Sequence, residues 1–188
     1  MRKLIEITFL SLDGVMDAPD IVQQAEKYFS GGEEQEYQKS RLFAADSLLL
    51  GRKTYENFSK AYSEMARSGK GPPMDFVERM NSIPKYVASN TLKEASWNAT
   101  VIRGDVADEV RKIKSQAGKD IIKYGTGSLD HVLLDNKLVD MLCLILYPFV
   151  LGHGTHLLEG LESAMHLRLA NEKRFESGTV VLEYLPSN

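Results

Sequence analysis

Cysteine is nearly absent from this sequence, and metal ligands are few. Cys143 is the only thiol among 188 residues, so no disulfide can form within the chain. Its neighbours are apolar, a pattern that predicts a buried, inert thiol in place of a nucleophile. His153 and His156 lie three residues apart without a third ligand, so we expect ordinary loop histidines and no metal site.

Long apolar runs and an excess of positive charge are missing as well. No apolar run approaches the length that spans a membrane, and the N-terminal segment, interrupted by Glu6, lacks the cleavage pattern of a signal peptide. The formal net charge is −3, so there is no domain-wide basic surface for nucleic acid. We expect a cytoplasmic protein with neither nucleic acid nor membrane as partner, while a local basic site for a small anion stays open.

Two familiar fingerprints of nucleotide binding are also lacking. The chain has no Walker loop. Gly125-Thr126-Gly127 is followed by Asp130, where G-x-G-x-x-G requires its third glycine. The standard Rossmann fingerprint is therefore absent from the sequence.

What is present is an alternation of strand-like and helix-like segments up to about residue 150. This order indicates an α/β fold with a mostly parallel sheet, and two final segments joined by a Glu-Ser-Gly turn indicate a closing antiparallel hairpin. We expect one domain over residues 1–188. Strands are predicted at 4–12, 47–50, 85–88, 100–103, 120–124, 138–150, 167–175 and 179–185, helices at 33–45, 54–62, 74–81, 106–117 and 125–135, and loops at 13–19 and 68–73.

Two glycine corners stand where a buried strand turns into a helix. A run of three leucines ends at Gly51, and Arg52, Lys53 and Thr54 follow at once. Amide groups at a helix N-terminus attract anions, and cations there oppose the helix dipole unless an anion offsets them. The second corner, Gly125-Thr126-Gly127-Ser128, offers close backbone approach together with hydroxyl donors. Each corner could bind phosphate, or could be an ordinary turn.

Four motifs, in order along the chain, resemble one superfamily. GRKTYE at 51–56 resembles the G-R-x-T-[WY]-E segment of dihydrofolate reductases, and SLDGVMDAP at 11–19 resembles the substrate-side loop of their riboflavin-type relatives. KYGTGSL at 123–129 is similar to the second glycine turn, and LYPFVLGHGTHLLEGL at 146–161 to the P-x-x-L-G-x-G-x-x-L stretch. The set resembles the RibD C-terminal domain branch as a stand-alone chain, because the zinc deaminase of the bifunctional riboflavin enzymes needs cysteines that are absent.

The resemblance implies a dihydrofolate reductase-like, three-layer α/β/α fold with a mixed, mostly parallel sheet, and NADPH as the hydride donor. It places phosphate-binding residues at both glycine corners and adenosine-binding residues after the strand at 85–88. The implied cofactor-binding residues are Gly51, Arg52, Lys53, Thr54, Ser89, Asn90, Gly125, Thr126, Gly127, Ser128 and Leu129.

The loop that begins at Asp13 would lie beside the nicotinamide. Asp13 is the candidate catalytic residue, which would orient substrate or relay a proton, or alternatively would cap the turn before Gly14. The resemblance also puts four residues on the substrate side of the pocket. These are Gly14, Gly152, Gly154 and Thr155.

The expected activity resembles that of 5-amino-6-(5-phosphoribosylamino)uracil reductase, with hydride transfer from NADPH to a small heterocyclic or sugar-like substrate. Dihydrofolate or pterin reduction is the alternative. Dihydrofolate reductases carry an acid in the first helix, whereas Glu33, Glu34 and Glu36 fit better as acids that complement a helix dipole. A nucleotide-binding protein without turnover is the alternative from another class. The apolar stretch at 141–150 could be core or the surface of a homodimer.

Overall fold

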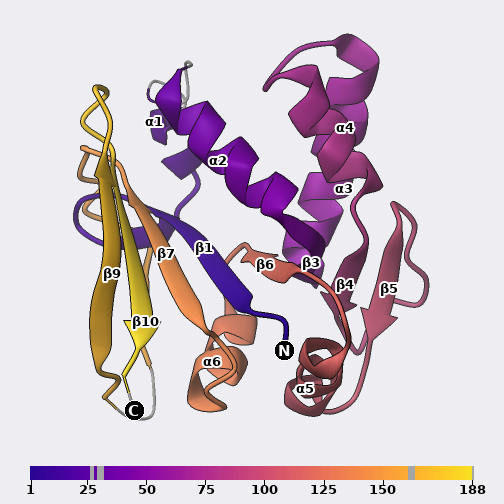
Figure 1. The fold of residues 1–188 in the computed structure, drawn as a ribbon. Helices are drawn as coiled ribbons and strands as arrows, with labels where there is room; N and C mark the ends of the chain where they lie inside the picture. Colours follow the sequence, from indigo (N-terminus) through magenta and orange to yellow (C-terminus); the bar gives the residue numbers. More distant parts are fainter. Residues whose placement is uncertain (26–27, 29–31, 161–163, 188) are drawn as a thin grey trace.

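The computed structural model describes residues 1–25, 28, 32–160 and 164–187, which are built around one mixed sheet of eight strands (Figure 1). The order across the sheet is β5-β4-β3-β6-β1-β7-β10-β9. Its strands are β1 (Leu4–Leu10), β3 (Ala45–Gly51), β4 (Lys85–Ala88), β5 (Ala99–Ile102), β6 (Asp120–Tyr124), β7 (Met141–Leu146), β9 (Leu167–Arg174) and β10 (Val180–Pro186). Two short strands, β2 (Val15–Asp17) and β8 (Thr155–His156), form a separate antiparallel pair.

The strands from β5 across to β7 are all parallel. Strands that are covered by helices on both sides need apolar residues on both faces, which explains their nearly continuous apolar runs. β1 lies between β6 and β7, with Ile5 opposite Ile122 on one side and Met141 on the other. The carboxyl ends of these parallel strands consequently meet at one edge of the sheet.

The C-terminal hairpin closes the sheet in the antiparallel sense. β10 pairs with β7 on one side and with β9 on the other. β9 is one of the two edge strands of the sheet, and nearly all of its side chains are exposed. The mixed, mostly parallel sheet with a closing hairpin, as predicted from the sequence, is confirmed.

Helices cover both faces of the sheet and produce three layers (Figure 1). α2 (Glu33–Ala44), α3 (Arg52–Ser68) and α4 (Met74–Ser82) pack on one face, whereas α5 (Val106–Ser115) and α6 (Ser128–Asp135) pack on the other. A short helix, α1 (Ile21–Ala25), follows β2. Over the described ranges, no helix combines the length and the apolar character that crossing a membrane requires.

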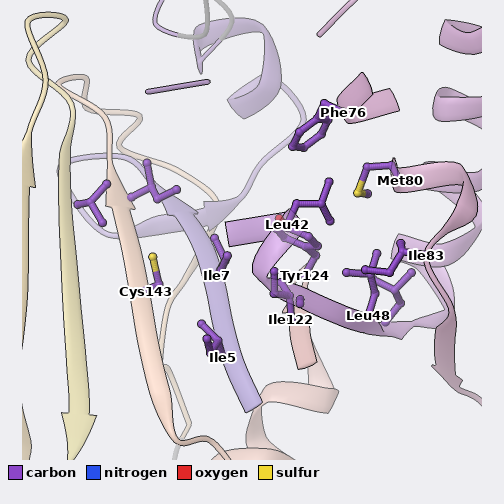
Figure 2. Close-up of a cluster of buried hydrophobic side chains, with 14 of the residues drawn as sticks. Ile5, Ile7, Leu42, Leu48, Phe76, Met80, Ile83, Ile122, Tyr124 and Cys143 are labelled. Carbon is purple, nitrogen blue, oxygen red and sulfur yellow. The ribbon is translucent and has the colours of Figure 1, made fainter. Parts of the chain in front are cut away.

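The larger core lies beneath α2, α3 and α4 (Figure 2). Alternate residues of β1, Ile5 and Ile7, face the side of the sheet from which Leu42 of α2 and Met80 of α4 approach. Cys143 is fully buried in the same cluster, which confirms the predicted buried thiol. Each large apolar side chain buried here contributes about 1.5–3 kcal/mol to the free energy of unfolding.

Several boundaries differ from the predicted ones, among them those of α3, β7 and the loop at 13–19. α3 begins at Arg52 instead of residue 54 and continues to Ser68, where Gly69 ends it in a left-handed conformation. β7 ends at Leu146, well short of residue 150, because Pro148 has no N–H for a strand ladder. The predicted loop at 13–19 contains β2, which is too short to show a strand pattern.

Candidate functional site

The turns after four parallel strands lie next to one another at the carboxyl edge of the sheet. Gly51 of β3 is paired with Ala88 of β4, and Ala88 is paired with Ile102 of β5. On the other side of β3, Leu50 is paired with Tyr124, the last residue of β6. The two glycine corners and the segment after β4 are therefore neighbours, at the kind of edge where open α/β sheets bind ligands.

The corner between β3 and α3 is open above its glycine. Gly51 has a φ of −75°, which any residue adopts, and a Cβ atom built on it would meet nothing within 4 Å. The protein itself imposes no need for glycine at this position. A ligand that approaches the backbone closely would impose one.

The two cations of this corner differ in their partners. Arg52 donates to Oε1 of Glu56 over 2.7 Å and to Oγ1 of Thr91 over 2.6 Å, so part of its charge is offset within the protein. Lys53 is exposed, and within the described ranges no carboxylate forms an ion pair with it. Because Lys53 is the second residue of α3, its charge opposes the helix dipole without compensation.

The corner between β6 and α6 touches the first corner. Gly125 has a φ of +84°, and a Cβ atom there would lie 2.0 Å from Oγ1 of Thr54, so only glycine fits. Gly127 has a φ of +136°, yet a Cβ atom there would meet nothing within 4 Å. The two corners are thus closed against each other, while the space above Gly51 and Gly127 is open.

A buried ionic cluster lies directly beneath the second corner. Lys123 of β6 has a side chain only 1% exposed, and its Nζ donates to the carbonyl of Gly125 over 2.5 Å. The same ammonium forms an ion pair with Asp130, which in turn accepts the amide of Gly127 over 2.8 Å. Glu6, paired with Lys123 across the β1–β6 ladder, brings a carboxyl oxygen to 3.7 Å from Nζ.

Burial governs the protonation of this cluster. It raises the pKa of Glu6 and lowers the pKa of Lys123, and the attraction between the two groups opposes both shifts. Two carboxyl groups share one ammonium, so a protonated Glu6 beside a Lys123–Asp130 ion pair leaves no uncompensated charge in the interior. The role of this cluster was missed in the sequence. The available signal was a charged residue within each of two apolar strands, Glu6 in β1 and Lys123 in β6.

The segments after β4 and β5 are tied to each other and to the first corner. The hydroxyl of Ser89 accepts two amides of the following turn, and Oδ1 of Asn90 accepts the amide of Gly104 after β5. Arg52 contacts the same turn through its hydrogen bond with Thr91. Arg103, which sequence reasoning did not single out, adds a further exposed cation directly after β5.

Asp13 joins the loops that follow β1 and β7. Its carboxylate accepts the hydroxyl of Ser11 over 2.6 Å and the amides of Leu151 and Gly152 over 3.2 Å and 2.8 Å. These hydrogen bonds, above all that of Ser11, lower the pKa of Asp13 to about 2. The carboxylate is therefore ionised at neutral pH, which favours the turn-fixing role over proton donation.

The predicted substrate-side residues lie around the small sheet of β2 and β8. They are Gly14, Gly152, Gly154 and Thr155. The carbonyl of Gly14 accepts the amide of Leu157 over 3.0 Å, which joins the two loops. Gly154 has a structural reason to be glycine, since a Cβ atom there would lie 2.6 Å from Cγ1 of Val15. Gly152 and Thr155 are both exposed.

Two cavities lie at the same end of the molecule as α1 and the start of α2. An apolar cavity of about 140 Å³ lies at the end of β1 and is lined by Phe9, Met16, Ile21, Val22 and Ala25. A larger cavity of about 220 Å³ lies between the start of α2 and the β9–β10 turn and is lined by Gly32, Glu33, Glu34, Phe175, Glu176 and Ser177. The apolar cavity has the chemistry to receive a flat ring, and the larger one contains three carboxyl groups.

Burial distinguishes Glu34 from the other acids at the start of α2. Glu34 is 3% exposed, whereas Glu33 and Glu36 are both exposed. Burial raises the pKa of Glu34, while hydrogen bonds with Tyr147 and Thr179 oppose that shift. Glu34 therefore does more than complement the helix dipole.

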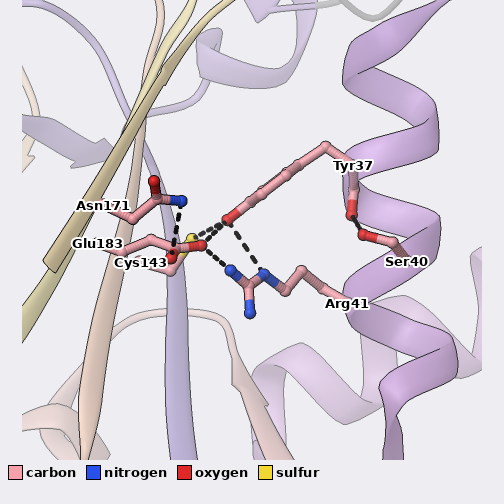
Figure 3. Close-up of polar contacts among 6 residues, drawn as sticks. All are labelled: Tyr37, Ser40, Arg41, Cys143, Asn171 and Glu183. Carbon is pink, nitrogen blue, oxygen red and sulfur yellow. Dashed lines mark hydrogen bonds and ion pairs between the residues drawn. The ribbon is translucent and has the colours of Figure 1, made fainter.

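A polar cluster anchors α2 to the C-terminal hairpin (Figure 3). The hydroxyl of Tyr37 donates to Oε1 of Glu183 over 2.6 Å and lies 3.1 Å from the buried thiol of β7. Arg41 forms an ion pair with the same carboxyl group, and Asn171 of β9 donates to its other oxygen over 3.2 Å. Because Glu34 lies one turn before Tyr37, this cluster also fixes Glu34 relative to the sheet.

The carboxyl edge fits a phosphorylated dinucleotide. The places that a Cβ atom would fill on Gly51 and Gly127 are open, and Lys53 supplies an uncompensated cation beside them. A metal ion finds no such site, since no cluster of three or more His, Cys, Asp or Glu side chains suits one among the described residues. The ring of His153 instead contacts Asp20 and the carbonyl of Leu151.

The sequence matches a known protein family and a related bacterial protein. Residues 2–181 match the family model described as the RibD C-terminal domain. The chain is also 31% identical over 139 residues to the uncharacterised protein YyaP of Bacillus subtilis (strain 168), which covers 74% of this chain and 73% of YyaP.

Solved structures share the fold. A diaminohydroxyphosphoribosylaminopyrimidine deaminase/5-amino-6-(5-phosphoribosylamino)uracil reductase of Thermotoga maritima gives a TM-score of 0.65 at 14% identity, over 99% of this chain and 57% of that one. Dihydrofolate reductase of Enterococcus faecalis gives a TM-score of 0.56 at 13% identity, over 99% and 97% of the two chains. The predicted dihydrofolate reductase-like fold is confirmed, and because the family model matches nearly the whole sequence, the chain belongs to the RibD C-terminal domain family.

Proposed function

We propose that this chain is an NADPH-dependent reductase, with a single reductase domain over residues 1–188. The observation that carries the proposal is the contact of Gly125 with Thr54, which sets two glycine corners side by side with open space above them. A pyrophosphate needs close approach to backbone amides and positive charge, and this edge supplies both. The E. faecalis dihydrofolate reductase is a complex with NADP(H), and the T. maritima protein is named as a reductase.

The chain's own residues divide the work of binding. Arg52, Lys53 and Thr54 at one corner, and residues 125–129 at the other, would hold the phosphates. Ser89 and Asn90 would shape the adenosine end. The exposed guanidinium group of Arg52 and the exposed ammonium group of Lys53 favour NADPH over NADH, because NADPH carries an additional phosphate.

At the reacting end, NADPH when bound supplies a hydride to a carbon of the substrate. Asp13 fixes the loops after β1 and β7, and the apolar cavity at the end of β1 keeps water away from a flat ring. Burial raises the pKa of Glu34, and this carboxyl group lines the cavity between the start of α2 and the β9–β10 turn. Glu34 is accordingly a better candidate than Asp13 for proton donation.

The proposed substrate is a small heterocyclic or sugar-like compound. The first compound to test is 5-amino-6-(5-phosphoribosylamino)uracil, which appears in the name of the T. maritima enzyme. Pterin reduction is the second candidate. The buried acid Glu34 on the first long helix favours it, because a carboxyl group suits the ring nitrogens of a pterin.

The test is a titration with NADPH and with NADH, followed by measurement of NADPH oxidation with each substrate in turn. We expect tighter binding of NADPH and turnover with the aminouracil. Turnover only with a dihydropterin would support the second candidate. Tight NADPH binding without turnover on either substrate would favour a nucleotide-binding protein, and no binding of NADPH would overturn the proposal.

A further inference from the structure

The turn after β6 is supported from below by a lysine in an unusual place. Lys123 belongs to a sheet strand between the buried residues Ile122 and Tyr124, and its own side chain is 1% exposed. Lysine is almost never fully buried unless it is paired, and burying the pair stabilises a fold no more than apolar residues of similar volume do. The charge at this position therefore points to a role other than packing.

Lys123 acts on both glycines of the turn. Its Nζ donates to the carbonyl of Gly125 over 2.5 Å, which draws that carbonyl toward the interior. Its ion-pair partner Asp130 accepts the amide of Gly127 over 2.8 Å, and a carboxyl oxygen of Glu6 lies 3.7 Å from Nζ. One carbonyl and one amide of this short turn thus have directions fixed by a single buried cluster.

Three further amides of the turn have no hydrogen-bond acceptor among the described residues. Throughout the described part of the chain, no group accepts a hydrogen bond from the amides of Thr126, Ser128 or Leu129. Successive unpaired amides form a concave binding site for an anion, and a carbonyl aimed into the same space would repel that anion. The nearest carbonyl is that of Gly125. It accepts a hydrogen bond from the buried Lys123 and is thereby directed away from this space.

We propose that Lys123, held by Asp130 and Glu6, is a positioning residue that orients the amides of the turn at 125–129 for the pyrophosphate of the cofactor. This inference rests on the proposed binding of NADPH. Because Lys123 is buried, it would act through the turn and not by contact with the cofactor.

The chain contains a matched lysine elsewhere. Lys114 of α5 has a side chain 5% exposed, and its Nζ donates to the carbonyl of Leu138 and to Asp140, each over 2.5 Å. Asp140 also accepts the amide of Leu4 over 2.7 Å, so this cluster lies at the amino ends of β1 and β7. Lys114 therefore has the same chemistry as Lys123 at the opposite edge of the sheet, away from both glycine corners.

The experiment compares Lys123→Met with Lys114→Met in the full chain. Each variant is measured by denaturant unfolding and by fluorescence titration with NADPH. We expect both variants to lose stability. Lys123→Met should raise the Kd of NADPH about tenfold or more, as the loss of a supporting residue beneath a binding group does, while Lys114→Met should stay within about twofold of the parent.

A second ligand separates a misplaced turn from a loosened fold. Adenosine 2′-phosphate carries the adenosine-end phosphate without either phosphate of the pyrophosphate, so its affinity should be close to parental in Lys123→Met. Equal NADPH affinities in the two variants would overturn the inference, and so would equal losses for NADPH and adenosine 2′-phosphate in Lys123→Met.

A milder pair covers the case in which Lys123→Met does not fold. Lys123→Gln and Lys114→Gln each keep a donor without the charge, and NADPH affinity should again fall only in the first variant. Equal affinities in this pair would overturn the inference. Failure of the parental chain to bind NADPH would overturn the proposed function and this inference together, whereas parental binding that Lys123→Gln also retains would overturn this inference alone.

Discussion

The corner between β3 and α3 and the corner between β6 and α6 both turn a buried strand into a helix, yet they carry their charge in opposite places. The first presents Arg52 and Lys53 at the surface, above a glycine with ordinary backbone angles. The second corner, residues 125–129, includes no lysine or arginine, and its glycines occupy left-handed conformations above the buried Lys123. We infer that the first corner contributes attraction, which salt screens, and the second contributes shape, which salt does not change.

The largest effect is expected at the contact between the corners. Gly125→Val places a branched side chain at a φ of +84° against Thr54, where even a Cβ atom would lie 2.0 Å from Oγ1. Strain and clash together should lower the free energy of unfolding by about 2–4 kcal/mol, and displaced corners should weaken NADPH binding on the order of 100-fold. Denaturant unfolding and NADPH titration measure the two effects.

Gly127→Val is the matched variant, because a Cβ atom on Gly127 meets nothing within 4 Å. Its loss of stability should be the smaller one, from backbone strain alone, of about 1–2 kcal/mol. Its loss of NADPH affinity should persist. A folded Gly127→Val variant with parental affinity would show that the second corner is an ordinary turn.

The next largest effect concerns the exposed cations. Replacing Arg52 and Lys53 with Ala should weaken NADPH about 10- to 100-fold and NADH far less, because charge-assisted hydrogen bonds to the additional phosphate are lost. Lys53→Ala alone should account for most of this, since Arg52 already pairs with Glu56. Lys60→Ala, an exposed residue further along α3, is the control.

Affinity for both cofactors across a range of salt concentrations sharpens the same comparison. Parental NADPH affinity should fall as salt rises, and the double variant should show a weaker dependence. Equal binding of NADPH and NADH by the parental chain would contradict the role given to these cations.

A smaller effect is expected from Gly51→Ala. The backbone at Gly51 suits any residue, so the free energy of unfolding should change by less than about 1 kcal/mol. If a phosphate lies against this glycine, the added methyl group should weaken NADPH about tenfold, with the fold intact. Parental affinity in this variant would mean that the open space above the first corner is not used.

The smallest effect on binding is expected at Asp13, which is remote from both corners in its contacts. Asp13→Asn should leave NADPH affinity within about twofold and turnover within about tenfold of the parent, because Asn can still make turn hydrogen bonds. An NADPH-binding variant that is inactive would instead place Asp13 at the reacting end of the pocket.

Asp13 also gives a pH dependence with a defined sign. Its pKa is lowered from 3.8 to about 2, so the ionised form stabilises the fold above the ordinary pKa, and this contribution is lost as the pH falls toward 2. The stability difference between the parent and Asp13→Asn should therefore be full above about pH 4 and should shrink through the acid window. Unfolding curves recorded between neutral pH and pH 3 test this.

The architecture was predictable because strands buried on both faces leave continuous apolar runs that alternate with helical stripes. The corners were predictable too, since a glycine and polar residues directly follow such a run. The ionic cluster beneath the second corner was not predictable, because the partners of Lys123 come from β1 and α6. No local sequence pattern indicates that β1 and β6 are neighbours in the sheet. In the sequence, Glu34 is one of several acids in the first turn of α2 and cannot be told apart from them. Only in the fold is it distinguished, because it is buried against Tyr147 and Thr179.

The uncovered edge strand β9 has a consequence for how the molecule behaves among its own copies. A row of free backbone groups on an edge strand invites another strand to pair with it, and proteins prevent this with charged side chains. β9 carries Arg168, Glu172, Lys173 and Arg174 within its eight residues, and in the described ranges no strand pairs with its outer side. A predicted homodimer that formed along this edge would have to set Glu172 of each copy against a cation of the other, such as Arg168 or Lys173, since registers such as Arg168 opposite Arg174 bring like charges together. The charges along β9, of which Lys173 also lies over the ring of Phe175, therefore oppose extension of the sheet into a neighbour's.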